Sequence, residues 1–242
     1  MSKLKYLLTI FIVLISVTGI RAQIILKSYF DIGENNASEG VFVKSVYRVN
    51  YQYLKFNIET GMQFNLISNN PNTITGLDIL GSTDFLVRKF PLSAKGYFML
   101  NRFSDLMYET NWGVGIETRK FEHFLFELGT NFKTYRFNSG AINKYNISKD
   151  KSKLRENFNL RYVISAYLKP HYNDWNLGLS CTNVDYYVIN QSTNPVFNFQ
   201  TTFKIKSNLT VYLDLWYKQA GMLNINAYYF GYFFRGGVIW KI

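Results

Sequence analysis

The last fifteen residues, Tyr228 to Ile242, alternate between two kinds of side chain up to the carboxyl terminus. One row is aromatic and aliphatic, whereas the other has smaller residues and carries both charges, Arg235 and Lys241. A period of two residues is the pattern of a β-strand with one apolar face. Soluble strands are mostly about 5 to 6 residues long, but a tilted strand that crosses a bilayer needs about 9 to 11. The terminal segment therefore predicts a membrane-crossing strand.

The same alternation recurs along the chain, most clearly from Arg48 to Leu66, from Leu106 to Thr118 and from His123 to Arg136. No segment of useful length shows the spacing of an amphipathic helix. The pattern predicts about twelve strands, with ten or fourteen as alternatives. Their expected spans are 23–32, 41–49, 52–67, 73–88, 92–103, 106–118, 121–136, 154–168, 174–186, 196–206, 208–219 and 228–242. We expect the last strand to pair with the first near Ile24 to Phe30.

The first 22 residues have the composition of a secretory signal peptide. Lys3 and Lys5 precede the apolar run from Leu7 to Val17, and Ala22 is a small residue at a plausible cleavage point. We therefore expect residues 1–22 to be removed and residues 23–242 to form one exported domain. The single cysteine, Cys181, cannot form an intramolecular disulfide, so disulfides do not hold the fold together.

The apolar row of the predicted strands is too large to fit inside a closed barrel. About five apolar residues on each strand exceed what a barrel interior can pack, while the opposite row carries many charges. We therefore expect an antiparallel up-and-down β-barrel whose apolar face meets lipid. A soluble β-sandwich is the rival fold, because it also buries one face of each sheet. It does not explain why every second connection along the chain is short.

Four residues at the carboxyl terminus form a spaced pattern. Arg235, Gly237, Trp240 and Ile242 follow its spacing: a polar residue, a glycine, and two hydrophobic residues separated by one position. This end of the chain resembles the C-terminal recognition signal of Gram-negative outer-membrane β-barrels, although an aromatic residue is more frequent at the last position than isoleucine. The resemblance implies an outer-membrane location and recognition by the barrel-assembly machinery. In such barrels the short turns and both termini are periplasmic, and the longer loops face outward.

Charged residues on the polar row are the candidates for lining the lumen. They are Lys44, Lys55, Glu59, Asp78, Lys95, Glu109, Glu117, Glu127, Lys133, Arg161, Asp214, Lys218 and Arg235. Opposite charges fall at neighbouring positions, and Glu127 and Arg161 are expected at similar depths on adjacent strands. Such ion pairs can fill the interior as readily as they can line a narrow aqueous pore, and the sequence leaves both interpretations open.

Basic residues also recur where the strands are expected to reach the periplasmic rim. This rim patch comprises Arg48, Arg88, Lys89, Arg119, Lys120, Lys169, Lys206 and Lys241. Contact with phospholipid phosphates explains it without a protein partner. The alternative is docking of an acidic periplasmic or envelope protein. On the opposite side, the lysine-rich loop around residues 144–155 is expected to meet lipopolysaccharide phosphates. Nucleic-acid binding is not expected, because this loop lacks an aromatic stacking platform.

Catalytic and metal patterns are weak. His123 could face Glu117 across a hairpin as a hydrolytic dyad, but a structural pair at the rim is the preferred interpretation. Asp78 and Asp84 lack the second acidic cluster that an aspartyl mechanism needs, and no His or Cys pair has metal-ligand spacing. We therefore expect no enzyme, cofactor or metal. Two hypotheses remain: a small passive channel, or a non-conducting barrel that serves as a subunit or anchor of an envelope assembly.

Overall fold

The structure of the chain is a computed structural model. It describes residues 23–35, 41–67, 74–102, 107–118, 121, 123–148, 152–168, 174–183, 195–218 and 231–242. The predicted signal peptide, residues 1–22, lies outside these ranges.

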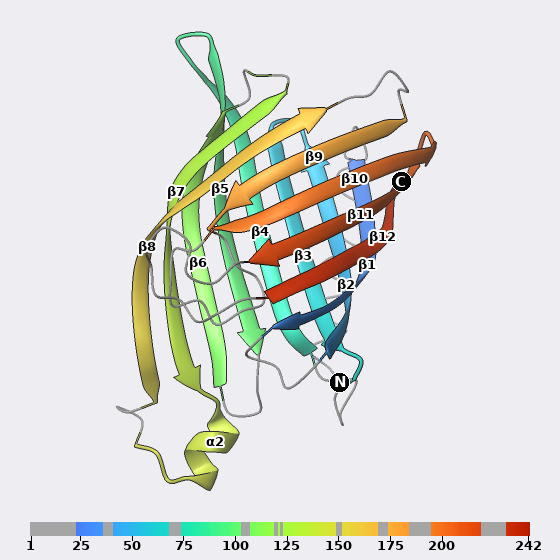
Figure 1. The fold of residues 1–242 in the computed structure, drawn as a ribbon. Helices are drawn as coiled ribbons and strands as arrows, with labels where there is room; N and C mark the ends of the chain where they lie inside the picture. Colours follow the sequence, from blue (N-terminus) through green and yellow to red (C-terminus); the bar gives the residue numbers. More distant parts are fainter. Residues whose placement is uncertain are drawn as a thin grey trace.

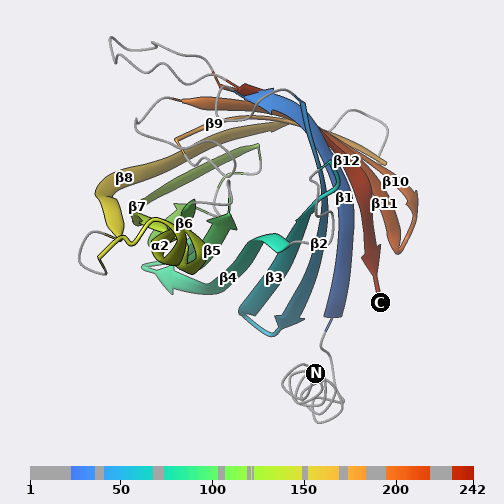
Figure 2. The same cartoon turned by 90° about the horizontal axis from the view of Figure 1, so that it is seen from below.

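The described residues form twelve β-strands in a closed barrel (Figure 1, Figure 2). The strands are β1 (Gln23–Asn35), β2 (Val41–Tyr53), β3 (Phe56–Asn65), β4 (Ile74–Val87), β5 (Phe90–Arg102), β6 (Met107–Thr118), β7 (Phe124–Phe137), β8 (Lys153–Leu168), β9 (Trp175–Thr182), β10 (Val196–Lys206), β11 (Leu209–Lys218) and β12 (Gly231–Lys241). Each strand pairs antiparallel with its neighbours in sequence, and β12 pairs with β1. The predicted up-and-down barrel of about twelve strands is confirmed.

The seam between β1 and β12 closes the barrel. Its register runs from Ile25 opposite Lys241 to Asn35 opposite Gly231. The backbone N–H of Ile242 also donates to the carbonyl oxygen of Ile24 at 2.9 Å. The last strand therefore pairs with the first where the sequence predicted. Of the segment expected to form this strand, residues 228–230 lie outside the described ranges.

The two rows of each strand are separated by the barrel wall, and β6 shows this best. Trp112, Val114 and Ile116 point outward and are 52%, 59% and 51% exposed. Glu109 and Glu117, on the other row, point inward and are buried. A soluble sandwich would bury the apolar row and expose the charges, which is the reverse of this arrangement. The apolar face is therefore the outer face.

One end of the barrel carries the tight turns together with Gln23 and Ile242, the first and last described residues, and we call it the turn end; the opposite end is the loop end. At the turn end, Arg88 and Lys89 connect β4 to β5 with φ angles of 47° and 70°. Two positive φ values fit a type I′ turn, whose twist matches that of the flanking strands. This hairpin extends past its neighbours, because Phe56 of β3 pairs with Thr83 (Figure 1).

The turn between β2 and β3 lies at Leu54 and Lys55, not at the predicted Asn50 and Tyr51. Strand β2 continues through Tyr53, and Leu54 reverses the chain with a φ of 52°. The prediction failed because the alternation continues through residues 48–53 without a glycine or proline to mark the turn. The shift moves Arg48 away from the rim and Lys55 onto it.

A short helix, α2 (Ser139–Lys144), follows β7 at the loop end (Figure 1). The Asn138 side-chain oxygen caps it by accepting from the Ala141 N–H at 2.7 Å. The sequence does not predict this helix, because six residues are too few for a periodic pattern. Within the described ranges, no helix has the length and hydropathy needed to cross a membrane.

The wall is uneven between β8 and β9. Strand β8 has 16 residues and β9 has 8, and among the described residues the two strands pair from Val163 to Leu168. Where β9 ends, side chains form hydrogen bonds with the backbone of β8. Thr182 Oγ1 donates to the Tyr162 carbonyl at 2.8 Å, and Asn183 Oδ1 accepts from the Tyr162 N–H at 2.9 Å. These contacts satisfy the edge of β8 where the regular ladder stops.

Candidate functional site

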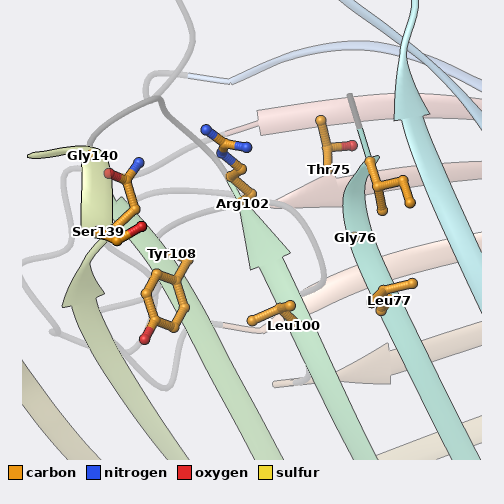
Figure 3. A pocket seen from close by; sticks show the side chains of 10 residues that line it. Thr75, Gly76, Leu77, Leu100, Arg102, Tyr108, Ser139 and Gly140 are labelled. Atoms are coloured by element: carbon orange, nitrogen blue, oxygen red, sulfur yellow. The ribbon is translucent and has the colours of Figure 1, made fainter. Parts of the chain in front are cut away.

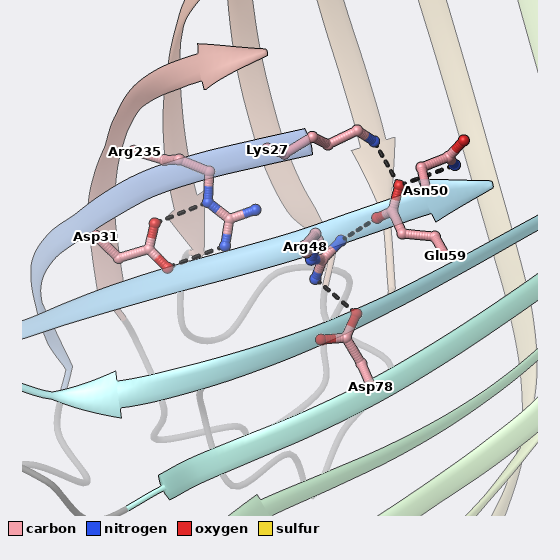
Figure 4. A network of polar contacts seen from close by, with 7 residues as sticks. All are labelled: Lys27, Asp31, Arg48, Asn50, Glu59, Asp78 and Arg235. Atoms are coloured by element: carbon pink, nitrogen blue, oxygen red, sulfur yellow. Dashed lines mark hydrogen bonds and ion pairs between the residues drawn. The ribbon is translucent and has the colours of Figure 1, made fainter. Parts of the chain in front are cut away.

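An ion-pair cluster on β1 to β4 projects into the lumen, and we call it the Arg48 cluster (Lys27, Arg48, Glu59 and Asp78; Figure 4). The Arg48 guanidinium lies 2.9 Å from Glu59 Oε1 and 3.0 Å from Asp78 Oδ2. Lys27 Nζ lies 2.5 Å from Glu59 Oε2. One arginine thus links two carboxylates from different strands, a geometry that suits its planar fork.

A glycine makes this geometry possible. Gly61 of β3 is the register partner of both Arg48 and Asp78 and lies between them. A Cβ at Gly61 would come within 2.5 Å of Asp78 Oδ1 and 2.8 Å of Arg48 Cγ. The missing side chain therefore leaves the space through which Arg48 reaches Asp78.

The seam that closes the barrel carries its own ion pair. Arg235 Nε donates to Asp31 Oδ1 at 2.7 Å, and Arg235 Nη2 donates to Asp31 Oδ2 at 2.9 Å (Figure 4). The guanidinium also lies 4.2 Å from the centroid of the Tyr29 ring. Because Asp31 and Arg235 face each other across β1 and β12, this bidentate pair links the first strand to the last.

A second cluster on β5 to β8, the Lys95 cluster, comprises Lys95, Glu117, Glu127 and Arg161. Glu117 and Glu127 are direct cross-strand partners, so their like charges need a cation nearby. Lys95 Nζ contacts both carboxylates, at 3.0 Å for Glu127, and Arg161 Nη2 lies 2.8 Å from Glu127 Oε1. Glu127 and Arg161 were expected at similar depths on adjacent strands, and the structure shows that they form a direct ion pair.

Charges of the two signs balance along the described lumen. The inward-facing acids that are buried are Asp31, Glu59, Asp78, Glu109, Glu117, Glu127 and Asp214. The inward-facing bases that are buried or half-buried are equal in number: Lys27, Lys44, Arg48, Lys95, Lys133, Arg161 and Arg235. In a balanced set of buried charges, the attraction between opposite charges offsets part of the desolvation cost of each member, and little net field remains along the lumen.

The wall formed by β9 and β10 differs from the rest. Its inward row carries six neutral polar residues: Asn176, Ser180, Thr182, Asn198, Gln200 and Thr202. Ser180 Oγ donates to Asn198 Oδ1 at 3.4 Å, and Asn176 Nδ2 donates to Thr202 Oγ1 at 3.4 Å. The described lumen therefore has a charged wall, rich in ion pairs, and a neutral wall of amides and hydroxyls.

Most lumen candidates from the sequence lie on the inward row. They are Lys44, Glu59, Asp78, Lys95, Glu109, Glu117, Glu127, Lys133, Arg161, Asp214 and Arg235. Lys55 was placed there wrongly, because it occupies the exposed turn at the end of β2. The side chain of Lys218 lies outside the described part. The structure adds Lys27 and Asp31, which were not predicted because the inward row of β1 also contains Ile25 and Tyr29.

The rim patch is only partly as expected. Arg88, Lys89, Lys206 and Lys241 are exposed at the turn end, whereas Arg48 was placed there wrongly and lies inside the lumen. Arg119, Lys120 and Lys169 lie outside the described residues.

The four residues of the carboxyl-terminal signal divide between the two faces. Trp240 and Ile242 point outward and are exposed, while Arg235 binds Asp31 in the lumen. Gly237 lies against Tyr29, where an added Cβ would approach the Ser28 carbonyl to 2.3 Å. Arg235 and Gly237 therefore have structural roles in the folded barrel, independent of any recognition during assembly.

The expected pairing of His123 with Glu117 is wrong. Glu117 pairs with Glu127 and contacts Lys95, whereas His123 Nδ1 lies 3.2 Å from the carbonyl oxygen of Tyr167. The turn is centred two residues later than predicted, so the two side chains do not meet. Within the described ranges, no three His, Cys, Asp or Glu side chains gather as a metal site would require.

No protein-family model matches the chain, and no curated protein matches it in sequence. Solved structures do match its fold. An outer-membrane channel of Pseudomonas putida F1 has a TM-score of 0.55 at 10% identity, covering 91% of this chain and 95% of the other. The NanC porin has a TM-score of 0.50 at 13% identity, covering 89% and 100%. Omp33 of Acinetobacter baumannii has a TM-score of 0.50 at 8% identity, covering 91% and 99%. The chain has the fold of outer-membrane β-barrel porins and channels.

Proposed function

We propose that the protein is a narrow passive channel for small solutes, constricted by the Arg48 and Lys95 clusters. The observation that carries this proposal is the two-sided lumen. Paired charges occupy β1 to β8 and the seam between β1 and β12, whereas the inward row of β9 and β10 offers neutral amides and hydroxyls. These groups can replace the hydrogen bonds of a hydrated solute without attracting one sign of charge.

The charge balance also predicts weak ion selectivity. A pore that selects by charge has an excess of one sign near its constriction. Here each described cluster combines acids with bases at hydrogen-bonding distance, so cations and anions meet similar fields. Size and hydrogen-bonding capacity are then the main filters.

The proposed orientation places the turn end in the periplasm and the loop end outside. It is supported by the position of Gln23 and Ile242, the first and last described residues, at the end with the tight turns, the usual arrangement in outer-membrane barrels. In this orientation the exposed Trp240 and Ile242 lie at the periplasmic edge, where the barrel-assembly machinery would meet them. The exposed Arg88, Lys89, Lys206 and Lys241 would lie near inner-leaflet phosphates.

Solute flux tests the channel. Vesicles containing purified protein should swell in small uncharged polyols and progressively less in larger saccharides, because the paired side chains narrow the lumen. Flux of small monovalent cations and anions should be similar. Swelling no faster than in protein-free vesicles, for every solute, would contradict the proposal.

A second candidate is a non-conducting barrel that anchors an envelope assembly. The favouring observation is the burial of the paired charges, since Glu117, Glu127, Arg161 and Asp31 are all nearly inaccessible. A filled interior of this kind stabilises a barrel without conducting. Absence of solute flux together with stoichiometric co-purification of an envelope protein in mild detergent would support this candidate over the channel.

A further inference from the structure

A pocket lies on the outer wall at the loop end of β4, β5 and β6, beneath the start of α2 (Figure 3). Its volume is about 470 Å³. Arg102 and Tyr108 line it together with Leu77 and Leu100, and Ser139 of α2 contributes to its edge. Leu100, Arg102 and Tyr108 belong to the outward rows of their strands, so the pocket opens away from the lumen.

The pocket changes in polarity along the barrel. Leu77 and Leu100 lie further toward the middle of their strands, where the outer wall is apolar. Arg102 is the last residue of β5, and Asn138 and Ser139 belong to the connection beyond β7. The pocket thus has an apolar floor and a polar, cationic edge toward the loops. A ligand that fits it has an apolar part and a polar, anionic part.

The cross-strand register continues the cationic edge beyond the pocket. Arg102 pairs with Tyr108, Tyr108 with Arg136, and Arg136 with Lys153. Arg102, Arg136 and Lys153 are all exposed. Lys153 also forms an ion pair with Glu156 at 2.8 Å, so its charge is partly compensated. The row therefore presents two arginines, flanking one tyrosine, at the boundary between the apolar wall and the loops.

We propose that this pocket binds the phosphorylated lipid portion of lipopolysaccharide. Acyl chains lie against Leu77 and Leu100, and a phosphate accepts hydrogen bonds from the guanidinium of Arg102, with Arg136 one strand pair away. Guanidinium groups suit phosphate oxygens because they donate two parallel hydrogen bonds. Charge complementarity thus identifies the occupant. The proposal rests on the orientation given above, since lipopolysaccharide is in the outer leaflet.

Lipid binding tests the site directly. Purified full-length protein is titrated in detergent with a diphosphorylated lipid A-type glycolipid, with phosphatidylglycerol and with inorganic phosphate, and complexes are counted by native mass spectrometry. Arg102→Gln and Arg136→Gln should each bind the glycolipid about tenfold more weakly than the wild type, as expected for one lost charged hydrogen bond. Arg88→Gln is the matched control, because it removes an exposed arginine at the opposite end.

The outcomes separate the sources of phosphate. Preferential glycolipid binding that falls in Arg102→Gln and Arg136→Gln but not in Arg88→Gln supports the site. Equal binding by all variants overturns it, as does binding of phosphatidylglycerol or inorganic phosphate as tight as that of the glycolipid. Each variant is shown to be a folded barrel if its unheated sample migrates differently from its heated sample in semi-native SDS electrophoresis. Solute flux is measured separately, so loss of the lipid site and loss of the channel are distinguishable.

Discussion

Replacing Arg48 with methionine should destabilise the folded barrel by about 3 to 5 kcal/mol, the usual cost of removing one partner from a buried ion pair. Arg48 binds both Glu59 and Asp78, and the substitution leaves Asp78 buried without this cation. Methionine keeps most of the side-chain volume, so the loss reports charge rather than packing. Urea unfolding in detergent micelles, followed by circular dichroism, measures the change.

Two further variants make this result specific. Arg88→Met removes an exposed arginine from a turn and should change stability by less than about 0.5 kcal/mol. Adding Asp78→Asn and Glu59→Gln to Arg48→Met should recover part of the loss, because the carboxylates are then no longer charged. An unchanged unfolding midpoint in Arg48→Met would show that the Arg48 cluster does not stabilise the barrel.

Trp240→Ala, or removal of Ile242, should lower the amount of inserted barrel in the outer membrane several-fold, and more than any single lumen substitution does. Both residues are exposed on the outer face at the turn end, where the assembly signal would be recognised. Ile242 also donates its N–H to Ile24 at 2.9 Å, so its loss removes one bond of the seam. Quantitative blotting of the membrane fraction, with folded and unfolded forms separated by cold electrophoresis, gives the readout.

The chain supplies a close control for this effect. Trp175 is also outward-facing at the turn end and is 47% exposed, against 48% for Trp240. Its ring packs edge-on against Phe203, so Trp175→Ala removes a comparable lipid-facing aromatic. Equal membrane levels of Trp175→Ala and Trp240→Ala would mean that the carboxyl-terminal tryptophan acts only as an interfacial anchor.

The fold was predictable because the alternation of apolar and polar residues persists through most strands. In β6 each outward Trp112, Val114 and Ile116 is followed by an inward glycine or glutamate, which fixes both the strand and its orientation. Turn positions were less predictable. Leu54 reverses the chain at a positive φ although its residue type favours neither a turn nor that conformation. Because β2 continues to this later turn, Arg48 lies in the lumen and not at the predicted rim.

The sequence predicts that ion pairs form in the lumen, but it does not predict which residues form most of them. Mixed charges on the inward row indicated ion pairs, and Glu127 with Arg161 was anticipated. Arg48 reaches Asp78 only because Gly61 leaves space between them, and this depends on the register of three strands. Asp31 and Arg235 are 204 positions apart in the sequence, so their ion pair exists only once the first and last strands have closed the barrel. Local sequence patterns carry neither kind of information.

The central claim is that paired charges constrict a conducting lumen, and single-channel recording in planar bilayers tests it most directly. Lys95→Ala combined with Glu127→Ala removes one cation and one anion from the Lys95 cluster, leaving the net charge unchanged. We expect small discrete steps from the wild type and clearly larger steps from this variant, with the same weak ion selectivity. Lys153→Ala with Glu156→Ala removes an equivalent pair from the exposed loop end and should leave the steps unchanged. No discrete steps from either the wild type or the Lys95 and Glu127 variant would contradict the claim.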